Sequence, residues 1–167
     1  MQTLYETQRL KITEATPSDI PYIMDLERQP ENRDYVFQGT YEDHLQEINS
    51  PEKLLALVTP KTGNLPKGFF IAVLDPDSHV LELKRIVIET KNQGFGREVI
   101  LGLMAYAFTT LDINRLWLDV FTDNPRGIHL YESLGMVSEG TKRQAYLAPS
   151  GEYKSQIIYS LLREEFH

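Results

Sequence analysis

The chain has 167 residues, of which 41% are hydrophobic and 25% charged, so it suits one domain with a sizeable core and is not disordered in composition. A formal net charge of −7 argues against nucleic-acid binding and favours cationic amines as ligands, although acidity also simply aids solubility. The lack of cysteine excludes disulfides and a catalytic thiol. No apolar run reaches the ~20 residues of a membrane span, and no secretory signal opens the chain. We therefore expect a cytoplasmic protein that binds no membrane.

The first half of the chain predicts one strand, two helices and then three strands. A strand is expected over residues 3–13, a helix from Thr16-Pro17-Ser18-Asp19 to Glu27, and a short helix over residues 41–48. Strands are expected over residues 54–59, 69–74 and 80–89, with turn residues between them.

The second half predicts a long helix, a strand, a short helix and two last strands. The long helix spans residues 94–111 and carries one broad apolar stripe. A strand follows over residues 115–121, a helix over 125–134 with Asn124 as N-cap and Gly135 at C′, and strands over 137–147 and 153–162. This order predicts an α/β fold, a mixed seven-stranded sheet flanked by about four helices.

The most informative segment is Lys-Asn-Gln-Gly-Phe-Gly-Arg-Glu at residues 91–98, a glycine turn between a strand and a helix. The first N–H groups of a helix lack internal partners, so such a turn binds anions and indicates a phosphorylated ligand. The segment has neither the glycine spacing of a P-loop nor the Lys and Ser/Thr that follow it. Gly94 and Gly96 fit a dinucleotide-binding fingerprint, but Val99 occupies the position of its third glycine. A plain turn that caps a helix remains an alternative.

The same segment resembles the coenzyme A loop of the GNAT N-acetyltransferases, Arg/Gln-x-x-Gly-x-Gly/Ala, with Lys91 in the Arg/Gln position. Residues 124–136, Asn-Pro-Arg-Gly-Ile-His-Leu-Tyr-Glu-Ser-Leu-Gly-Met, are similar to a second segment of that family, with Gly127 and Met136 as departures. The opening at residues 4–12 and the ending at 151–162 resemble the RimJ/RimL branch.

The resemblance covers nearly the whole chain and implies a single GNAT domain over residues 1–167 with the acyl-CoA N-acyltransferase fold. In that fold the fourth and fifth strands, here residues 80–89 and 115–121, splay apart around the pantetheine arm of the cofactor. The implied activity is direct acetyl transfer from acetyl-CoA to a primary amine, either a protein N-terminus or a small molecule. A non-catalytic acyl-CoA-binding sensor or scaffold is the alternative.

Two residues are candidates for catalysis by this resemblance. Tyr131 matches the family tyrosine that protonates the leaving thiolate, a transfer that ordinary phenol and thiol pKa values make uphill by only ~2 kcal/mol. Its position three residues after Ile128 fits a core side chain equally. Glu82 is the candidate general base, acting through water, although its alternation with Lys84 also fits a solvated strand face.

The resemblance also assigns cofactor and acceptor contacts. Main-chain N–H groups around Val87 and Ile88 are expected to bind the oxyanion. The expected cofactor-binding residues are Ile86, Val87, Ile88, Gln93, Gly94, Phe95, Gly96, Arg97, Asn124 and Tyr131. Residues 30–44 are expected to border the acceptor, with the polar and aromatic side chains Glu31, Asn32, Tyr35, Phe37, Tyr41 and His44.

Two expectations concern metals and partners. The histidines His44, His79, His129 and His167 show no metal-ligand spacing, so no metal is expected and all four are interpreted as surface or loop residues. The final strand is expected to be exposed, where it could pair across a homodimer.

Overall fold

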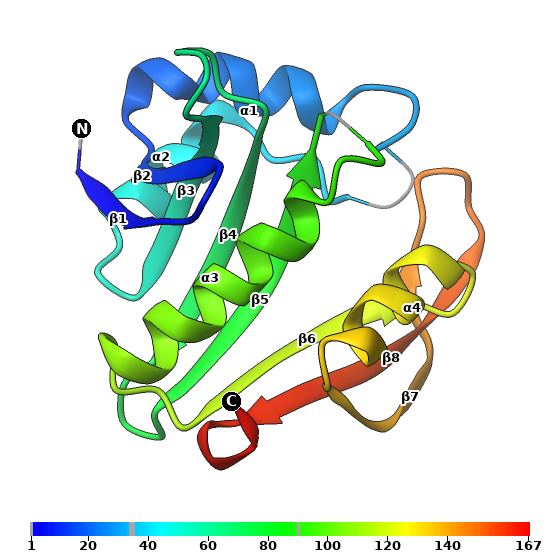
Figure 1. The fold of residues 1–167 in the computed structure, drawn as a ribbon. Helices are drawn as coiled ribbons and strands as arrows, with labels where there is room; N and C mark the ends of the chain where they lie inside the picture. Colours follow the sequence, from blue (N-terminus) through cyan, green and yellow to red (C-terminus); the bar gives the residue numbers. More distant parts are fainter. Residues whose placement is uncertain (1, 34–35, 90) are drawn as a thin grey trace.

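The computed structural model describes residues 2–33, 36–89 and 91–167 of the chain (Figure 1). Two short 3-10 helices, η1 (Pro17–Asp19) and η2 (Arg163–Glu165), accompany the main elements. In chain order these are β1 (Thr3–Glu6), β2 (Leu10–Glu14), α1 (Ile20–Glu27), α2 (Tyr41–Asn49), β3 (Lys53–Pro60), β4 (Gly68–Asp75), β5 (Val80–Ile88), α3 (Phe95–Thr109), β6 (Arg115–Phe121), α4 (Pro125–Ser133), β7 (Val137–Leu147) and β8 (Tyr153–Leu162).

The strands form one mixed sheet in the order β1-β2-β3-β4-β5-β6-β8-β7. Strands β5 and β6 pair in parallel, and the other neighbouring strands pair antiparallel. Helices α3 and α4 lie on one face of the sheet, and α1 and α2 lie on the other (Figure 1). This confirms the predicted α/β architecture with a mixed sheet.

The N-terminal segment differs from the prediction. The single strand expected over residues 3–13 is a hairpin of β1 and β2, so the described sheet has eight strands rather than seven. Thr7 closes the turn: its N–H donates to the Leu10 carbonyl (2.9 Å), and its hydroxyl oxygen accepts from the Leu10 N–H (3.1 Å). Such local side-chain bonding competes with a continuous strand, and the alternation of apolar residues does not reveal it.

Two apolar cores lie on opposite faces of the sheet, because successive side chains of a strand point in opposite directions. In β3, Ala56 and Val58 join the core beneath α3, whereas Leu55 and Leu57 join the core beneath α1. The central strands are therefore covered on both faces.

Strand β5 contains a β-bulge. Leu83 pairs with Ala72 and Arg85 pairs with Ile71, so Lys84 is an extra residue without an opposite partner. The bulge resets the alternation of the strand: Leu81, Leu83, Ile86 and Ile88 all pack on the α3 side, while Arg85 reaches the α1 side.

Strands β5 and β6 diverge just before this bulge. Their parallel pairing joins Val80 to Arg115, Leu81 to Leu116 and Glu82 to Trp117, and no further pair follows in the described strands. In Figure 1 the two strands start side by side and separate toward the loop that leads into α3. The fork predicted by the family resemblance is therefore present between β5 and β6.

The far edge of the sheet also differs from the prediction. The final strand β8 lies between β6 and β7, because the antiparallel β7–β8 hairpin folds back with β8 innermost. The exposed edge at this end of the sheet belongs to β7, so the expected free final strand was wrong. None of the helices in the described part of the chain is both long and apolar enough to cross a membrane.

The N-terminal hairpin is attached to the first turn of α3 through Glu98. Its carboxylate accepts hydrogen bonds from the Thr7 hydroxyl, the Arg9 N–H (2.8 Å) and the Arg9 guanidinium (2.7 Å). Burial alone would raise the pKa of Glu98. The hydrogen bonds from Thr7 and Arg9 and the charge of Arg9 outweigh burial, so the pKa of Glu98 is lowered.

Glu98→Gln is expected to lower the free energy of unfolding at pH 7 by ~1–2 kcal/mol, because charge-assisted hydrogen bonds become neutral ones. A lowered folded pKa stabilises the protein above the ordinary glutamate pKa of ~4.3, and this stabilisation is lost as pH falls through the folded value. Urea unfolding at several pH values measures both effects, with Glu164→Gln as an exposed control. Equal stability of Glu98→Gln and wild type at pH 7 would contradict this role.

Candidate active site

The fork between β5 and β6 opens into a cleft of about 1130 Å³ that also reaches the 91–97 loop and α4. Of the residues predicted for catalysis or cofactor binding, all but Gln93 line this cleft. Gln93 instead lines a smaller pocket beside Arg9 and Lys61. Segments predicted separately from sequence thus meet at one place.

The loop before α3 has the geometry of an anion site. Gly94 is the N-cap of α3 and adopts a left-handed conformation (φ 75°), which glycine tolerates without strain. The free N–H groups of the first turn and the helix dipole then face this end of the cleft. The residues therefore fit the pyrophosphate of coenzyme A.

Three cations surround this loop. The Arg97 guanidinium donates to the Ser133 hydroxyl on α4 (2.8 Å), and the Arg126 guanidinium donates to the Asn92 side chain. Burial, followed by the charge of Arg126, lowers the pKa of Lys91. These contacts draw α3, α4 and the loop together around positive charge.

Main-chain donors from β5 face the fork. The Glu89 N–H donates to the Lys67 carbonyl beside β4 (2.7 Å). Because N–H directions alternate along a strand, the Val87 N–H also points to β4, whereas those of Ile86 and Ile88 point into the fork. Within the segment around Val87 and Ile88 where oxyanion donors are predicted, this alternation favours the N–H groups of Ile86 and Ile88, and their role stays a prediction.

Tyr131 on α4 reaches the cleft from the α3 side of the sheet and packs against the core there. Burial and then the charge of Asp119 raise the pKa of Tyr131 to about 12. Its hydroxyl has no hydrogen-bond partner among the residues that the structure describes. A neutral phenol therefore remains available as a donor.

Glu82 and Asp119 come from β5 and β6 at the base of the fork, on the face opposite the apolar residues that flank them. Burial and then the charge of Asp119 raise the pKa of Glu82. Asp119 itself accepts hydrogen bonds from the Lys142 ammonium (2.9 Å) and the Gln156 amide (3.3 Å). Two carboxylates thus share this part of the cleft, and only Asp119 is neutralised by a close cation.

Asn124 caps α4 and lines the cleft at once. Its side-chain oxygen accepts from the Gly127 N–H (3.0 Å), as the sequence predicts for an N-cap. A Cβ at Gly127 would lie 2.8 Å from the Asn124 side-chain nitrogen, so the glycine in place of the family alanine gives that amide room. The amide nitrogen of Asn124 is left for a ligand.

The segment expected to border the acceptor is only partly at the cleft. Glu31, Asn32, Val36 and Phe37 line it, and Tyr35 lies outside the described residues. Tyr41 is 42% exposed and lies away from the described lining.

His44 is fully buried on α2, so its interpretation as a surface or loop residue was wrong. Its ring lies between the carboxylates of Glu27 and Glu47, which satisfy both ring nitrogens inside the fold. The other three histidines are exposed.

Several charged residues of the cleft had no role predicted from sequence, among them Asp119 and Arg126. Asp119 had a signal: a carboxylate is unfavourable within a strand, and it stands between the apolar residues Leu118 and Val120. Arg126 stood inside a recognised motif without an assigned role. Among the described residues no group of three potential metal ligands occurs, and the absence of a metal stays a prediction.

Comparisons with known proteins agree with this geometry. A sequence profile of the Acetyltransferase (GNAT) domain matches residues 9–137. Spermidine N(1)-acetyltransferase of Vibrio cholerae is 40% identical over 55 residues, which are 33% of this chain and 32% of that protein. The uncharacterized N-acetyltransferase p20 of Bacillus licheniformis is 25% identical over 181 aligned positions, covering 99% of each chain.

Solved structures extend the similarity to the whole fold. The crystal structure of spermidine N-acetyltransferase from Vibrio cholerae in complex with CoA and spermine has a TM-score of 0.84, with 22% identity, and the match covers 95% of this chain and 98% of that one. At this identity the match shows a shared fold. The profile match, which spans most of the sequence, shows the family: the chain belongs to the GNAT acetyltransferase family.

Proposed function

We propose that this protein is a single-domain, acetyl-CoA-dependent N-acetyltransferase over residues 1–167 that acetylates a cationic small-molecule amine. The meeting of two charged groups of residues in one cleft carries the proposal. Lys91, Arg97 and Arg126 gather around the glycine loop. The carboxylates Glu82 and Asp119 line the diverging strands, with Lys84, Arg85 and Lys142 nearby. The spermidine acetyltransferases among its relatives suggest polyamines as the acceptor class.

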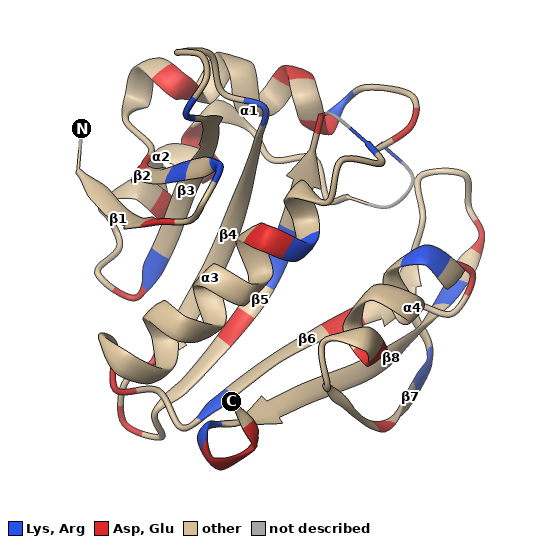
Figure 2. Cartoon of the chain, viewed as in Figure 1, with Lys and Arg blue, Asp and Glu red and all other residues tan. Residues whose placement is uncertain are grey.

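Each end of the cleft suits one substrate. Figure 2 shows a basic segment near the start of α3 and of α4, an acidic one beside it in α3, and both acidic and basic segments on the diverging strands β5 and β6. Lys91, Arg97 and Arg126 with the N–H groups of the loop suit the phosphates of the cofactor. Glu82 and Asp119 attract a protonated amine to the base of the fork.

The two sides of the sheet separate the chemical roles. Glu82 faces the α1 side and would accept a proton from the amine, directly or through water, since its raised pKa makes it a better base. The N–H groups of Ile86 and Ile88 would stabilise the oxyanion that develops on attack.

Tyr131 faces the leaving group from the other side of the sheet. With its pKa raised to about 12, full proton transfer to a thiolate of ~8.5 is uphill by roughly 3.5 units, or ~5 kcal/mol. This free-energy cost is larger than the ~2 kcal/mol expected from ordinary phenol and thiol pKa values. We therefore assign Tyr131 a hydrogen bond to the departing sulfur rather than complete proton transfer.

A protein N-terminus is the second candidate acceptor, because both ends of the chain resemble the RimJ/RimL branch. Cytoplasmic location, the absence of nucleic-acid and membrane partners and a homodimer also stay predictions.

The experiment that tests the function has two steps. Excess acetyl-CoA, NADH or ATP is first compared in thermal melts; a ligand at a hundred times its Kd raises Tm by roughly 5–10 °C for a domain of this size. Release of free thiol is then measured with spermidine, spermine and a peptide with a free N-terminus. A shift with acetyl-CoA and release with polyamines support the proposal; binding without any release favours a sensor, and a shift with a nucleotide alone contradicts it.

Tyr131→Phe is expected to lower kcat by ~10- to 100-fold, because the departing thiolate loses its donor while the ring still packs. The affinity for acetyl-CoA, measured by calorimetry, should stay within twofold. Tyr146→Phe, also at the cleft but on β7, is the matched control. Unchanged turnover at saturating substrates would remove Tyr131 from the mechanism.

Asp119→Asn is expected to lower the pKa of Glu82, because loss of a neighbouring negative charge favours the ionised carboxylate. Carbon-13 NMR of the labelled glutamate carboxyls, with Glu82→Gln for assignment, measures the shift. Asp123→Asn is the matched control. Asp123 lines the same cleft but pairs with Lys154 (3.0 Å), so this change should leave the pKa of Glu82 unaltered. A higher or unaltered pKa in Asp119→Asn would refute the coupling.

A further inference from the structure

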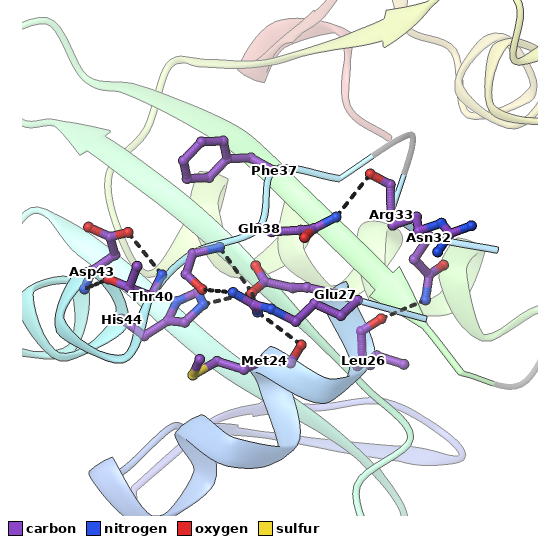
Figure 3. A network of polar contacts seen from close by, with 12 residues as sticks. Met24, Leu26, Glu27, Asn32, Arg33, Phe37, Gln38, Thr40, Asp43 and His44 are labelled. Atoms are coloured by element: carbon purple, nitrogen blue, oxygen red, sulfur yellow. Dashed lines mark hydrogen bonds and ion pairs between the residues drawn. The ribbon is translucent and has the colours of Figure 1, made fainter. Parts of the chain in front are cut away.

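A buried charged network joins α1, α2 and β5 behind the acceptor side of the cleft. Figure 3 shows its contact between Glu27 and His44. Its members are Glu27, His44, Glu47 and Arg85. The side chains of Glu27 and His44 are fully buried, and those of Glu47 and Arg85 are 8% and 9% exposed. No residue predicted for catalysis or cofactor binding belongs to this network.

The two contacts of the His44 ring favour its cationic form. Its Nδ1 lies 2.6 Å from Glu47 Oε1, and its Nε2 lies 2.9 Å from Glu27 Oε1. Opposite two ionised carboxylates, a neutral imidazole with its single N–H would set two lone pairs against each other at one contact. Only the imidazolium donates at both nitrogens.

Charge balance agrees with a cationic His44. Arg85 bonds Glu27 (3.2 Å) and lies 3.7 Å from Glu47, so two anions meet two cations. Arg28 lies at the rim, 3.8 Å from Glu27. With His44 neutral, the two buried carboxylates would face only Arg85 and the 40% exposed Arg28, whose charge water screens, and this is unfavourable in the interior.

The pKa of His44 agrees with this assignment. Burial alone would lower it, but the hydrogen bonds and charges of Glu27 and Glu47 outweigh burial and raise the pKa of His44 to about 9. Asp43 on the same helix is the remaining nearby carboxylate and is exposed.

The network holds the segment 36–39 against β5. Glu27 accepts from the Gly39 N–H (3.3 Å), and the Arg28 guanidinium donates to the Gly39 carbonyl (2.9 Å). The Arg85 guanidinium donates to the Phe37 carbonyl (3.5 Å) and lies 5.1 Å from the centre of its ring. Arg85 and Phe37 both line the cleft, and Arg85 follows the bulge of β5.

We propose that this network, with His44 as a cation, is a positioning device that sets Val36 and Phe37 as the acceptor-side wall of the cleft. The inference rests on the proposed function, because the wall must contact an amine substrate. His44 touches no substrate itself. It acts through Glu27 and Arg85 on acceptor binding, and no member of the network has a hydrogen bond or ion pair with a described residue of the 91–97 loop.

His44→Gln is expected to raise KM for the amine roughly tenfold, because the binding wall loses its fixed position, and a misplacement of even ~1 Å can cost up to ~100-fold. KM for acetyl-CoA should stay within twofold. The double variant His44→Gln/Glu47→Gln, which again pairs one anion with one cation, should recover most of the acceptor KM. His79→Gln, an exposed histidine on a turn, is the matched control.

Two further measurements keep the test decisive if a variant fails to fold or no amine is acetylated. Nitrogen-15 NMR should show His44 protonated on both nitrogens at pH 8 in wild type. Hydrogen exchange of the Gly39 amide should accelerate in the His44 variant relative to the control. Stabilisation by His44 should be complete below the unfolded pKa of ~6.5 and be lost as pH rises through about 9.

The outcomes separate the two proposals. If no amine is acetylated but His44 is protonated on both nitrogens, the proposed function is overturned, and the acceptor wall with it. The charged network around a cationic His44 would still be supported. Three results would overturn the inference alone while the enzyme still acetylates an amine. These are a neutral His44 at pH 8, an equal rise in KM for both substrates in His44→Gln, and no recovery of the acceptor KM in the double variant.

Discussion

Parallel pairing between β5 and β6 ends after Glu82 and Trp117, and the cleft exists because the two strands stop pairing there. The bulge at Lys84 follows at once and turns the strand away from its neighbour. The freed side of β5 then presents main-chain N–H groups to the fork rather than to another strand. A sheet that paired fully along both strands would have neither a cleft nor these donors.

The same bulge connects the cleft to the body of the protein. It places Leu83 and Ile86 under α3 while Arg85 points to the opposite face, where it meets Glu27. One irregular residue therefore links the wall of the cofactor cleft with the buried charges behind the acceptor side. Cations lie where α3 and α4 begin, and the diverging strands carry both carboxylates and cations (Figure 2).

Much of the fold could be predicted from local patterns. Helix α3 has an unbroken apolar stripe, and α4 has its cap at Asn124 and a left-handed Gly135 at its end, so their positions follow from sequence. The β1–β2 hairpin could not be predicted in this way, because the bond that closes it belongs to Thr7 and Leu10 in a segment whose apolar residues fit one strand.

The site was predictable only where motifs carry it. The Gly94–Gly96 loop and Tyr131 stand in recognisable segments and do lie at one cleft. His44 could not be placed, because what makes it a buried cation is Glu27, far away in the sequence. The role of Asp119 likewise depends on Glu82 across the fork, whose pKa its charge raises. Periodicity alone does not identify these two residues as neighbours.

The most direct test of this account is a crystal structure of the protein grown with coenzyme A. We predict that the pantetheine arm lies in the fork between β5 and β6 and that the pyrophosphate binds the N–H groups of Gly94 to Arg97. The sulfur should then lie within hydrogen-bond reach of the Tyr131 hydroxyl. Coenzyme A bound outside the fork, for example with its phosphates beside Gln93 and Lys61, would contradict the assignment of the cleft.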